Sequence, residues 1–308
     1  MNVALLFPGQ APRNLLAALE ATAREPAGKA LLDHAAAAAQ VPLARLFERG
    51  GRALDRTEIL QPALTAVALH AARALQLEGV TPIAVAGHSL GELAAWSAAG
   101  AVSAEDAVDL AALRGRLMAR EAARTPGSLL ALLDGSDAAV HRALAAGLPH
   151  GALAVAAWNA PDEVVLTGAP AALAAAAFVV PARPLAVDGA WHSPAMADAV
   201  SELRAALRAA PRRPLVCPLI ANRDGLPAAE DRIPDLLTEQ LTHPIHWTRT
   251  LATLTNLGVT DYVTVGPGAV LRGLVRKCLG ASIRVHGTED AADRSRTLSA
   301  LRGLSQIR

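Results

Sequence analysis

Short apolar segments and longer segments with helical periodicity alternate along the chain. Val3–Phe7 and Ile83–Ala86 are short apolar runs followed by turn-forming residues, a pattern that predicts buried strands. Leu16–Ala39 and Ala104–Arg120 instead carry alanine and leucine at the spacing of one helix face, the first with a break near Pro26. Strands that alternate with helices predict a parallel sheet covered on both faces, so the predicted fold class is α/β.

The pattern changes between residues 126 and 189. Strand, helix, strand, strand, helix and strand follow one another there over about sixty residues, which is the split βαβ order of a ferredoxin-like unit. We therefore predict a catalytic part with a parallel, α/β-hydrolase-like sheet, formed by residues 1–125 and 190–308. The ferredoxin-like unit is predicted as an insert over residues 126–189.

The strand Ile83–Ala86 is joined to a helix predicted over Leu90–Ala99 by Gly87-His-Ser-Leu-Gly91, a G-x-S-x-G sequence. In such a strand-to-helix turn the serine hydroxyl is exposed, and the N-terminus of the next helix points at an oxyanion formed there. Glycine is expected on both sides because a Cβ atom would collide with the neighbouring strand or helix. A chance match in a glycine-containing loop is the alternative, but the flanking elements favour Ser89 as a nucleophile.

Arg114 lies in the middle of the apolar stripe of the helix predicted over Ala104–Arg120. At about 100° per residue, the stripe also contains Ala107, Leu110, Ala111, Leu117 and Met118. A guanidinium on a buried face cannot lose its charge, and leaving it unpaired there is very unfavourable. Three interpretations stay open: a structural salt bridge, a side chain that reaches past the stripe to solvent, and a clamp for a substrate carboxylate.

His192 lies at a junction between a predicted strand and a predicted helix. Ser193 and Pro194 form a favourable N-cap and first helical position, so the helix is expected to begin directly after the histidine. A histidine just outside a helix N-terminus can reach a pocket. The alternative is a surface loop histidine that is hydrogen-bonded to the backbone.

The sequence predicts no metal site. His243 and His246 form H-P-I-H, but they have no partners at metal-ligand spacing, and Pro244 breaks any helix that would align them. His88 is adjacent to Ser89, so its side chain is expected to point away from the serine hydroxyl.

Composition excludes several classes of function. The chain has 29 basic and 28 acidic residues, so no overall charge attracts it to nucleic acid or to a membrane. No apolar stretch approaches the ~20 residues of a membrane span. The first residues predict a strand and lack the basic flank of a signal peptide. Two distant cysteines, Cys217 and Cys278, fit a reducing compartment. We expect a soluble, cytoplasmic protein.

Taken together, these segments resemble the malonyl-CoA:acyl carrier protein transacylases and the related acyltransferase domains of polyketide synthases. G-H-S-L-G-E alone is shared by many serine acyl enzymes, whereas the ordered set, which covers nearly the whole chain, is far more specific. The segments that carry the resemblance are Phe7-Pro-Gly-Gln10, Gln61-Pro-Ala-Leu64, Gly87-His-Ser-Leu-Gly-Glu92, Leu113-Arg-Gly115, Asn159-Ala-Pro161, Gly189-Ala-Trp-His-Ser193, Gln240 before His243-Pro244, and Val265-Gly-Pro-Gly268.

The resemblance implies ping-pong acyl transfer. Ser89 would carry the acyl group as an ester, and His192 would be the base that activates it. The family orients this histidine with a backbone carbonyl, here that of Gln240, in place of an acidic third residue. The backbone N–H groups of Gln10 and Leu90 would form the oxyanion hole, a contribution of roughly a hundred- to a thousandfold in rate per donor.

The resemblance also implies the substrates. Arg114 matches the arginine with which the family grips the free carboxylate of a malonyl group. The pocket around it would be lined by Gln61, Asn159, His88 and Trp191. Malonyl-CoA, or a related dicarboxylic acyl-CoA, would be the donor and the phosphopantetheine thiol of an acyl carrier protein the acceptor. We expect no cofactor, no nucleic acid or membrane partner, and a monomer.

Two positions depart from the family pattern. The first family motif usually continues Gly-Gln-Gly-x-Gln, whereas Gln10 is followed here by Ala11-Pro-Arg13. Trp191 stands where many members have a smaller or different aromatic residue that shapes the acyl pocket. The alternative functions are a malonyl transferase subunit of malonate decarboxylase, an acyltransferase or editing hydrolase for other acyl groups, and a silent module that binds a carrier protein.

Overall fold

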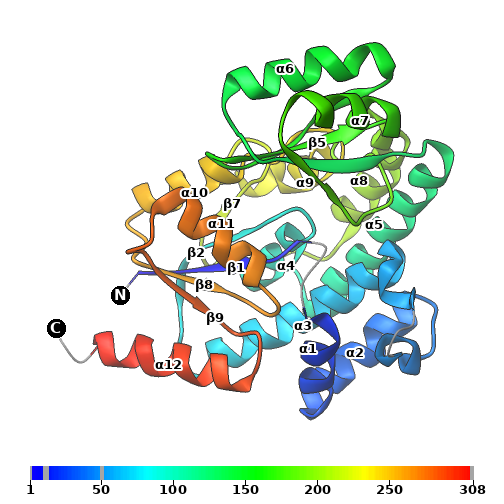
Figure 1. Cartoon of the computed structure of the whole chain (residues 1–308). Coiled ribbons are helices and arrows are strands. Elements are labelled where there is room, and N and C mark those ends of the chain that lie inside the picture. Colours follow the sequence, from blue (N-terminus) through cyan, green and yellow to red (C-terminus); the bar gives the residue numbers. More distant parts are fainter. Residues whose placement is uncertain (1, 10–13, 49–51, 306–308) are drawn as a thin grey trace.

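The computed structural model describes residues 2–9, 14–48 and 52–305 (Figure 1). Its larger sheet has the strand order β7-β2-β1-β8-β9, and every neighbouring pair is parallel. The strands are β1 Val3–Phe7, β2 Pro82–Gly87, β7 Leu219–Ile220, β8 Asp261–Thr264 and β9 Arg284–Gly287. All five residues of β1, which lies between β2 and β8, are buried, as expected for a parallel strand covered on both faces.

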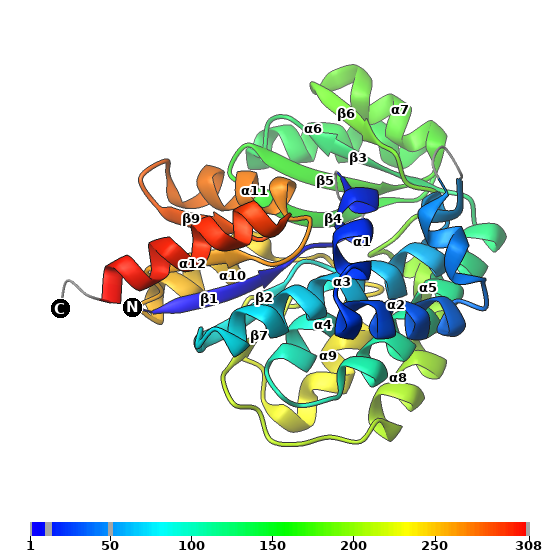
Figure 2. The same cartoon turned by 90° about the horizontal axis from the view of Figure 1, so that it is seen from below.

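Helices cover both faces of this sheet. Figure 1 shows α10 and α11 on one side of it and α12 on the other, and Figures 1 and 2 both show the start of β1 and the end of α12 at the same end of the molecule. The α-helices of this part are α1 Leu15–Ala23, α2 Pro26–Ala38, α3 Thr57–Leu77, α4 Gly91–Ala98, α5 Ala104–Arg124, α8 Val200–Ala209, α9 Ile233–Glu239, α10 Trp247–Asn256, α11 Ala269–Leu279 and α12 Ala291–Ser305. Its 3₁₀ turns are η1 Leu43–Phe47, η2 Arg52–Asp55, η4 Pro194–Ala199 and η5 Glu230–Arg232.

A second, antiparallel sheet lies between residues 128 and 185, and Figure 1 shows its helices α6 and α7 packed together above it. Its order, β4-β5-β3-β6, is the ferredoxin-like one, and it has its own apolar core around Leu130, Leu132 and Leu166. Its elements are β3 Ser128–Leu132, α6 Asp137–Gly147, η3 Leu148–His150, β4 Leu153–Ala160, β5 Glu163–Gly168, α7 Pro170–Val179 and β6 Ala182–Leu185.

The predicted fold class is confirmed: a parallel sheet with helices on both faces accompanies a separate antiparallel sheet. The two parts are joined by more than the chain, because the N–H of Trp158 in β4 donates to the carbonyl oxygen of Ile245 at 2.8 Å. The predicted limits of the insert, residues 126 and 189, stay a prediction.

Several element boundaries differ from those predicted. The strongly apolar run from Ala63 to Gly79 predicts a helix that begins at Ala63, whereas α3 begins at Thr57 and continues through Pro62, so Gln61 is carried on a helix. The helix expected from Pro194 starts as the 3₁₀ turn η4 and becomes α-helical only at Val200. Among the described residues no helix meets the length and hydropathy that a membrane span requires.

The carboxyl ends of parallel strands share one edge of a sheet, and ligands of such folds bind there. At this edge β2 ends at Gly87, β1 at Phe7 and β7 at Ile220. The segments that follow β2 and β7 therefore approach one another although more than a hundred residues separate them. This edge carries the candidate site.

Candidate active site

Ser89 sits in a strained turn between β2 and α4. Its φ of 52° is in the left-handed region, which a residue with a side chain enters only when its surroundings hold it there. A Cβ on Gly87 would collide with the backbone of Gly91, and a Cβ on Gly91 would collide with the backbone of Phe7. Both glycines are thus required by close packing of the turn against α4 and β1, as the sequence predicted.

Asn222 holds this turn from the neighbouring strand. The Ser89 N–H donates to Asn222 Oδ1 at 2.7 Å, and Asn222 Nδ2 donates to the carbonyl oxygen of Gly87 at 2.5 Å. The Asn222 side chain is fully buried, so these bonds satisfy backbone groups that water cannot reach. Sequence reasoning missed this residue; the available signal was its position directly after the strand that neighbours β2.

Ser89, His192 and Gln240 form a connected series of hydrogen bonds. Ser89 Oγ lies 2.9 Å from His192 Nε2, and His192 Nδ1 lies 2.7 Å from the backbone oxygen of Gln240. A carbonyl only accepts, so it fixes the proton on Nδ1 and leaves Nε2 to accept the serine proton. The structure thus brings together the predicted nucleophile, the predicted base and the predicted orienting carbonyl.

The His192 ring is held neutral. Burial lowers its pKa, the positive charge of Arg114 lowers it further, and the sum reaches about 3 in spite of the bond to Gln240. His192 also has a positive φ of 58°, which points to a second strained position facing Ser89. A neutral imidazole has the protonation state that a general base needs.

Arg114 is buried without a carboxylate partner. It is 2% exposed, and its guanidinium donates to Gln61 Oε1 and Gln240 Oε1, each at 2.8 Å, and to Ser89 Oγ at 3.2 Å. Within the described residues no carboxylate lies at ion-pair distance from it. This excludes the structural salt bridge and the solvent-reaching side chain, because the group is neither ion-paired within that part of the chain nor exposed. Burial lowers the Arg114 pKa only to about 10, so it stays a cation at neutral pH.

Gln61 presents its amide oxygen to Arg114 because its nitrogen is already engaged. Gln61 Nε2 donates to Thr57 Oγ1 at 2.8 Å and to Met118 Sδ at 3.4 Å. Two neutral amide oxygens, from Gln61 and Gln240, thus solvate a buried positive charge. They leave its net charge uncompensated.

The remaining predicted residues surround this centre. His88 turns away from Ser89: its Nε2 lies 2.8 Å from Asn159 Oδ1, and its ring meets Trp247 edge-on at 5.5 Å between centroids. Leu90 is buried at the start of α4, where the first backbone N–H groups have no partner within the helix. Gln10, the other predicted oxyanion donor, lies outside the described residues.

Trp191 connects the site to an open groove of about 1230 Å³ between α3, α5 and the segment after β6. The indole is 5% exposed, and its Nε1 has no hydrogen-bond partner among the described residues. Other lining residues are Leu15, Thr57, Leu60, Ala119 and Gly127. Of the predicted site residues within the described part of the chain, Trp191 lines this groove, whereas Ser89, His192 and Arg114 do not.

Glu92 is a second buried ionisable group that sequence reasoning did not single out. It is 1% exposed; its Oε1 accepts from the Asn222 N–H at 2.9 Å and its Oε2 from Gln240 Nε2 at 2.5 Å. Burial raises the Glu92 pKa to about 8, against the opposing effect of these bonds and of Arg114. The motif G-H-S-L-G-E contained the signal, since the final glutamate lies on the buried helix after the serine.

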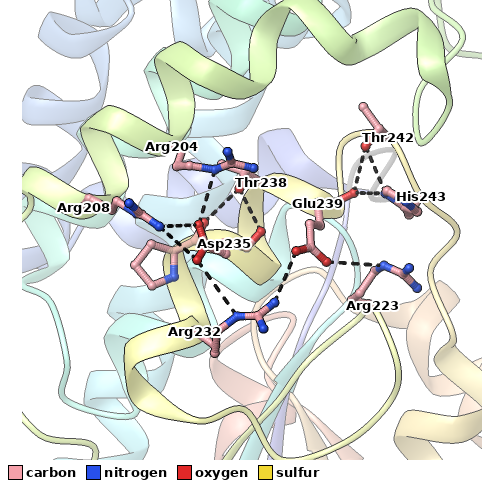
Figure 3. Close-up of polar contacts among 10 residues, drawn as sticks. Arg204, Arg208, Arg223, Arg232, Asp235, Thr238, Glu239, Thr242 and His243 are labelled. Atoms are coloured by element: carbon pink, nitrogen blue, oxygen red, sulfur yellow. Dashed lines mark hydrogen bonds and ion pairs between the residues drawn. The ribbon is translucent and has the colours of Figure 1, made fainter.

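Gln240 lies directly after α9, and arginines hold that helix in place (Figure 3). Asp235 on α9 pairs with Arg208 at 3.0 Å and Arg204 at 3.3 Å, and Glu239 pairs with Arg232 at 3.3 Å and Arg223 at 3.5 Å. We call these six residues the α9 ion-pair cluster; they are Arg204, Arg208, Arg223, Arg232, Asp235 and Glu239. The cluster anchors the helix that Gln240 directly follows, and so helps to position the contacts of Gln240 with His192, Arg114 and Glu92.

A partly buried serine in a strand-to-helix turn, hydrogen-bonded to an oriented histidine in an α/β fold, defines a class of enzymes that transfer acyl groups through a serine ester. The comparisons with known proteins agree. The model of the acyl transferase domain family matches residues 1–255. The chain belongs to this family and is an acyltransferase.

Relatives of known structure and function are similar over almost the whole chain. The malonyl CoA-acyl carrier protein transacylase of Bacillus subtilis is 33% identical, with 90% of each chain covered. The malonyl-CoA:acyl carrier protein transacylase structure from Xanthomonas oryzae pv. oryzae has a TM-score of 0.89 at 32% identity, covering 97% of this chain and 99% of that one. A malonyl-transacylase solved with a type II polyketide acyl-carrier protein has a TM-score of 0.89 at 28% identity, covering 97% and 100%.

Proposed function

We propose that this acyltransferase moves a malonyl group, or a closely related dicarboxylic acyl group, from coenzyme A to the phosphopantetheine thiol of an acyl carrier protein. The observation that carries the proposal is Arg114: a buried cation that contacts the nucleophile and has only neutral partners within the described residues. A carboxylate can accept two parallel hydrogen bonds from a guanidinium and supply the missing negative charge. The names of the related transacylases support the same substrate.

In the first half-reaction, the Ser89 hydroxyl gives its proton to His192 Nε2 while Oγ attacks the thioester carbonyl carbon. The oxyanion of the tetrahedral intermediate faces the N–H at the start of α4, which stabilises it without reorganisation. The carbon–sulfur bond then breaks, and His192 returns the proton to the departing coenzyme A sulfur. Ser89 is left as a malonyl ester.

In the second half-reaction, the thiol of the carrier protein enters by the same route. His192 takes its proton, the sulfur attacks the ester carbonyl, and the Ser89 oxygen leaves with the proton that His192 returns. The second half-reaction follows the steps of the first in reverse order, so His192 serves as the base in both. None of these steps requires a cofactor, and we propose that the enzyme uses none.

The acyl carboxylate also tunes the base. Burial is the main cause of the low His192 pKa, and the charge of Arg114 is the next. A carboxylate that neutralises Arg114 removes the second cause and raises the His192 pKa toward the working pH, where proton transfer is most effective. Substrates without a carboxylate leave the histidine a weaker base. The same pair, Arg114 and His192, thus contributes both to binding and to rate.

The acyl-enzyme tests the proposal directly. After incubation with malonyl-CoA, intact-protein mass spectrometry should show one added malonyl group on the wild type and none on Ser89→Ala. A matched control is Ser201→Ala, an exposed serine on α8, which should acquire the group normally. Acylation of Ser89→Ala would show that the nucleophile is another residue. Transfer of the label to a phosphopantetheinylated carrier protein would complete the reaction.

A further inference from the structure

Arg114 and Glu92 are two buried charges joined by one amide. Arg114 donates to Gln240 Oε1 at 2.8 Å, and Gln240 Nε2 donates to Glu92 Oε2 at 2.5 Å. The same nitrogen also lies 2.9 Å from the carbonyl oxygen of Ser89, so the relay passes directly behind the nucleophile. We call Arg114, Gln240 and Glu92 the amide relay. The reaction described above uses Arg114 and the Gln240 backbone, and it leaves Glu92 without a role.

The surroundings of Glu92 contain few other charges. Its helix, α4, packs against β1, β2, α3 and α5, and the two strands carry no charged residue. The charges that act on Glu92 are Arg114 on α5 and Asp224 after β7. The ionisable residues of α3 are engaged elsewhere or exposed: Glu58 pairs with Arg56, His70 pairs with Glu25, and Arg73 is exposed.

One buried cation cannot neutralise two buried anions. In the absence of substrate, Arg114 is the cation that favours an ionised Glu92. When an acyl carboxylate occupies Arg114, an ionised Glu92 would be a second anion in the same water-poor pocket, and like charges there disfavour ionisation strongly. We propose that Glu92 must carry a proton when a dicarboxylic acyl group binds Arg114, and that it takes this proton up from water wherever it is ionised, so that Glu92 sets the selectivity between dicarboxylic and neutral acyl groups. This inference rests on the proposed function.

The side-chain amide of Gln240 can link carboxylate binding at Arg114 to protonation of Glu92. The acyl carboxylate replaces Gln240 Oε1 as the acceptor for Arg114, which leaves that oxygen without its donor. A half-turn of the amide then lets Oε1 accept the new O–H of Glu92, and it turns Nε2 toward the acyl carboxylate. In this arrangement the O–H of Glu92 and the guanidinium of Arg114 both have acceptors, and the carbonyl oxygen of Ser89 loses Gln240 Nε2 but keeps the backbone N–H of Glu92 at 3.0 Å. Proton uptake and carboxylate binding are thereby linked, and the linkage is reciprocal.

The linkage predicts a specific pH dependence. Glu92 ionises near pH 8 in the free enzyme, whereas His192 stays neutral throughout the range from pH 6.5 to 9. Below pH 8 Glu92 already carries its proton, and the preference for a dicarboxylic group is fully expressed. Above pH 8 binding must reprotonate it, so the preference declines.

The test measures acyl loading with malonyl-CoA and with acetyl-CoA from pH 6.5 to 9 and takes the ratio of the two kcat/KM values. Effects on Ser89 and coenzyme A are common to both substrates and cancel, and His192 stays neutral over this range, so it does not shape the pH dependence of the ratio. The wild-type ratio should fall about tenfold between pH 7 and pH 9. Glu92→Gln, which cannot titrate, should change less than twofold over the same range. Glu92→Asp should keep the decline, and the exposed control Glu105→Gln should match the wild type.

The possible results separate the two proposals. A wild type that prefers malonyl-CoA with a ratio independent of pH, or a Glu92→Gln enzyme that declines like the wild type, overturns the role of Glu92 and leaves the proposed function intact. A wild type without preference for malonyl-CoA at any pH overturns the proposed function itself.

A second measurement needs no variant at Glu92, in case Glu92→Gln does not fold. Calorimetry of Ser89→Ala at pH 8, in two buffers with different ionisation enthalpies, counts the protons taken up on binding. Malonyl-CoA should bind with about half a proton more than acetyl-CoA, because Glu92 is half ionised there. Equal proton uptake for the two ligands would overturn the inference.

Discussion

The arginines of the α9 ion-pair cluster and Arg114 both contact the segment around α9, but their surroundings are opposite in kind. In the α9 ion-pair cluster, partly exposed arginines surround Asp235 and Glu239, two carboxylates of the same chain (Figure 3). At the end of the same helix, Arg114 is buried against amide oxygens. An arginine with a structural role has its anion within the protein. The contrast indicates that Arg114 is kept for an anion that arrives with the substrate.

The strongest test of this contrast is Arg114→Ala. We expect loading from malonyl-CoA to fall about a hundred- to a thousandfold in kcat/KM, since a buried charged hydrogen-bond pair contributes roughly 2–5 kcal/mol. Loading from acetyl-CoA should fall much less, so the discrimination between the two should largely vanish. Steady-state acylation with each acyl-CoA measures both. Unchanged discrimination would remove the clamp role.

A second test removes a residue that holds the turn of the nucleophile. Asn222→Ala leaves the Ser89 N–H buried without its acceptor, which destabilises the fold by about 1–3 kcal/mol. Acylation should slow for malonyl-CoA and acetyl-CoA by the same factor, because toward the amide relay the variant keeps the backbone N–H that donates to Glu92 and loses only a 3.5 Å side-chain contact with Gln240. Urea unfolding and the two acylation rates measure these effects. A change in selectivity would mean that Asn222 belongs to the acyl pocket.

The pH dependence of stability reports on Glu92 without any substrate. Burial raises its pKa from the ordinary value of 4.5 to about 8, so between these values the folded state binds a proton that the unfolded state has lost. The contribution of Glu92 to stability is therefore complete below pH 4.5 and is lost as the pH rises to about 8. Denaturant midpoints of the wild type minus those of Glu92→Gln should decrease over this window and level off above it. A difference between the two midpoints that does not change with pH would mean that the pKa of Glu92 is the same in the folded and unfolded states.

The smallest effect is expected from a substitution in the α9 ion-pair cluster. Arg208 is 61% exposed on its side chain and shares Asp235 with two other arginines, so Arg208→Ala should change stability by less than about 1 kcal/mol. Acyl selectivity should not change at all. A large shift in selectivity would show that the cluster and the relay act as one unit, and the contrast between them would fail.

The sequence could predict those features that depend on residues close together along the chain. The turn around Ser89 and the buried position of Arg114 are local patterns, a motif between two elements and a periodicity along one helix, and both are present in the structure. The Asn222 side chain and the side-chain contacts of Gln240 could not be predicted. Those contacts join residues more than 120 positions apart, as in Arg114 with Gln240 and Ser89 with Asn222.

The prediction of where α3 begins was wrong for a different reason. The apolar run predicted a start at Ala63, yet α3 begins at Thr57 and continues through Pro62, although proline removes a helical hydrogen bond. Packing of the first turn against α5 outweighs that loss: a Cβ on Gly115 would meet the backbone of Thr57 and Glu58 within 2.8 Å. This close approach brings Gln61 to Arg114, a consequence that no local pattern contains.

The most direct test of the central claim is a competition. The wild-type enzyme is mixed with equal concentrations of malonyl-CoA and acetyl-CoA at pH 7, and the mass of the acyl group on Ser89 is read by intact-protein and peptide mass spectrometry at early times. The account predicts that nearly all acyl-enzyme carries malonyl, and that Arg114→Ala carries no such excess. An acyl-enzyme that is mainly acetyl, or the same malonyl excess in both proteins, would contradict it.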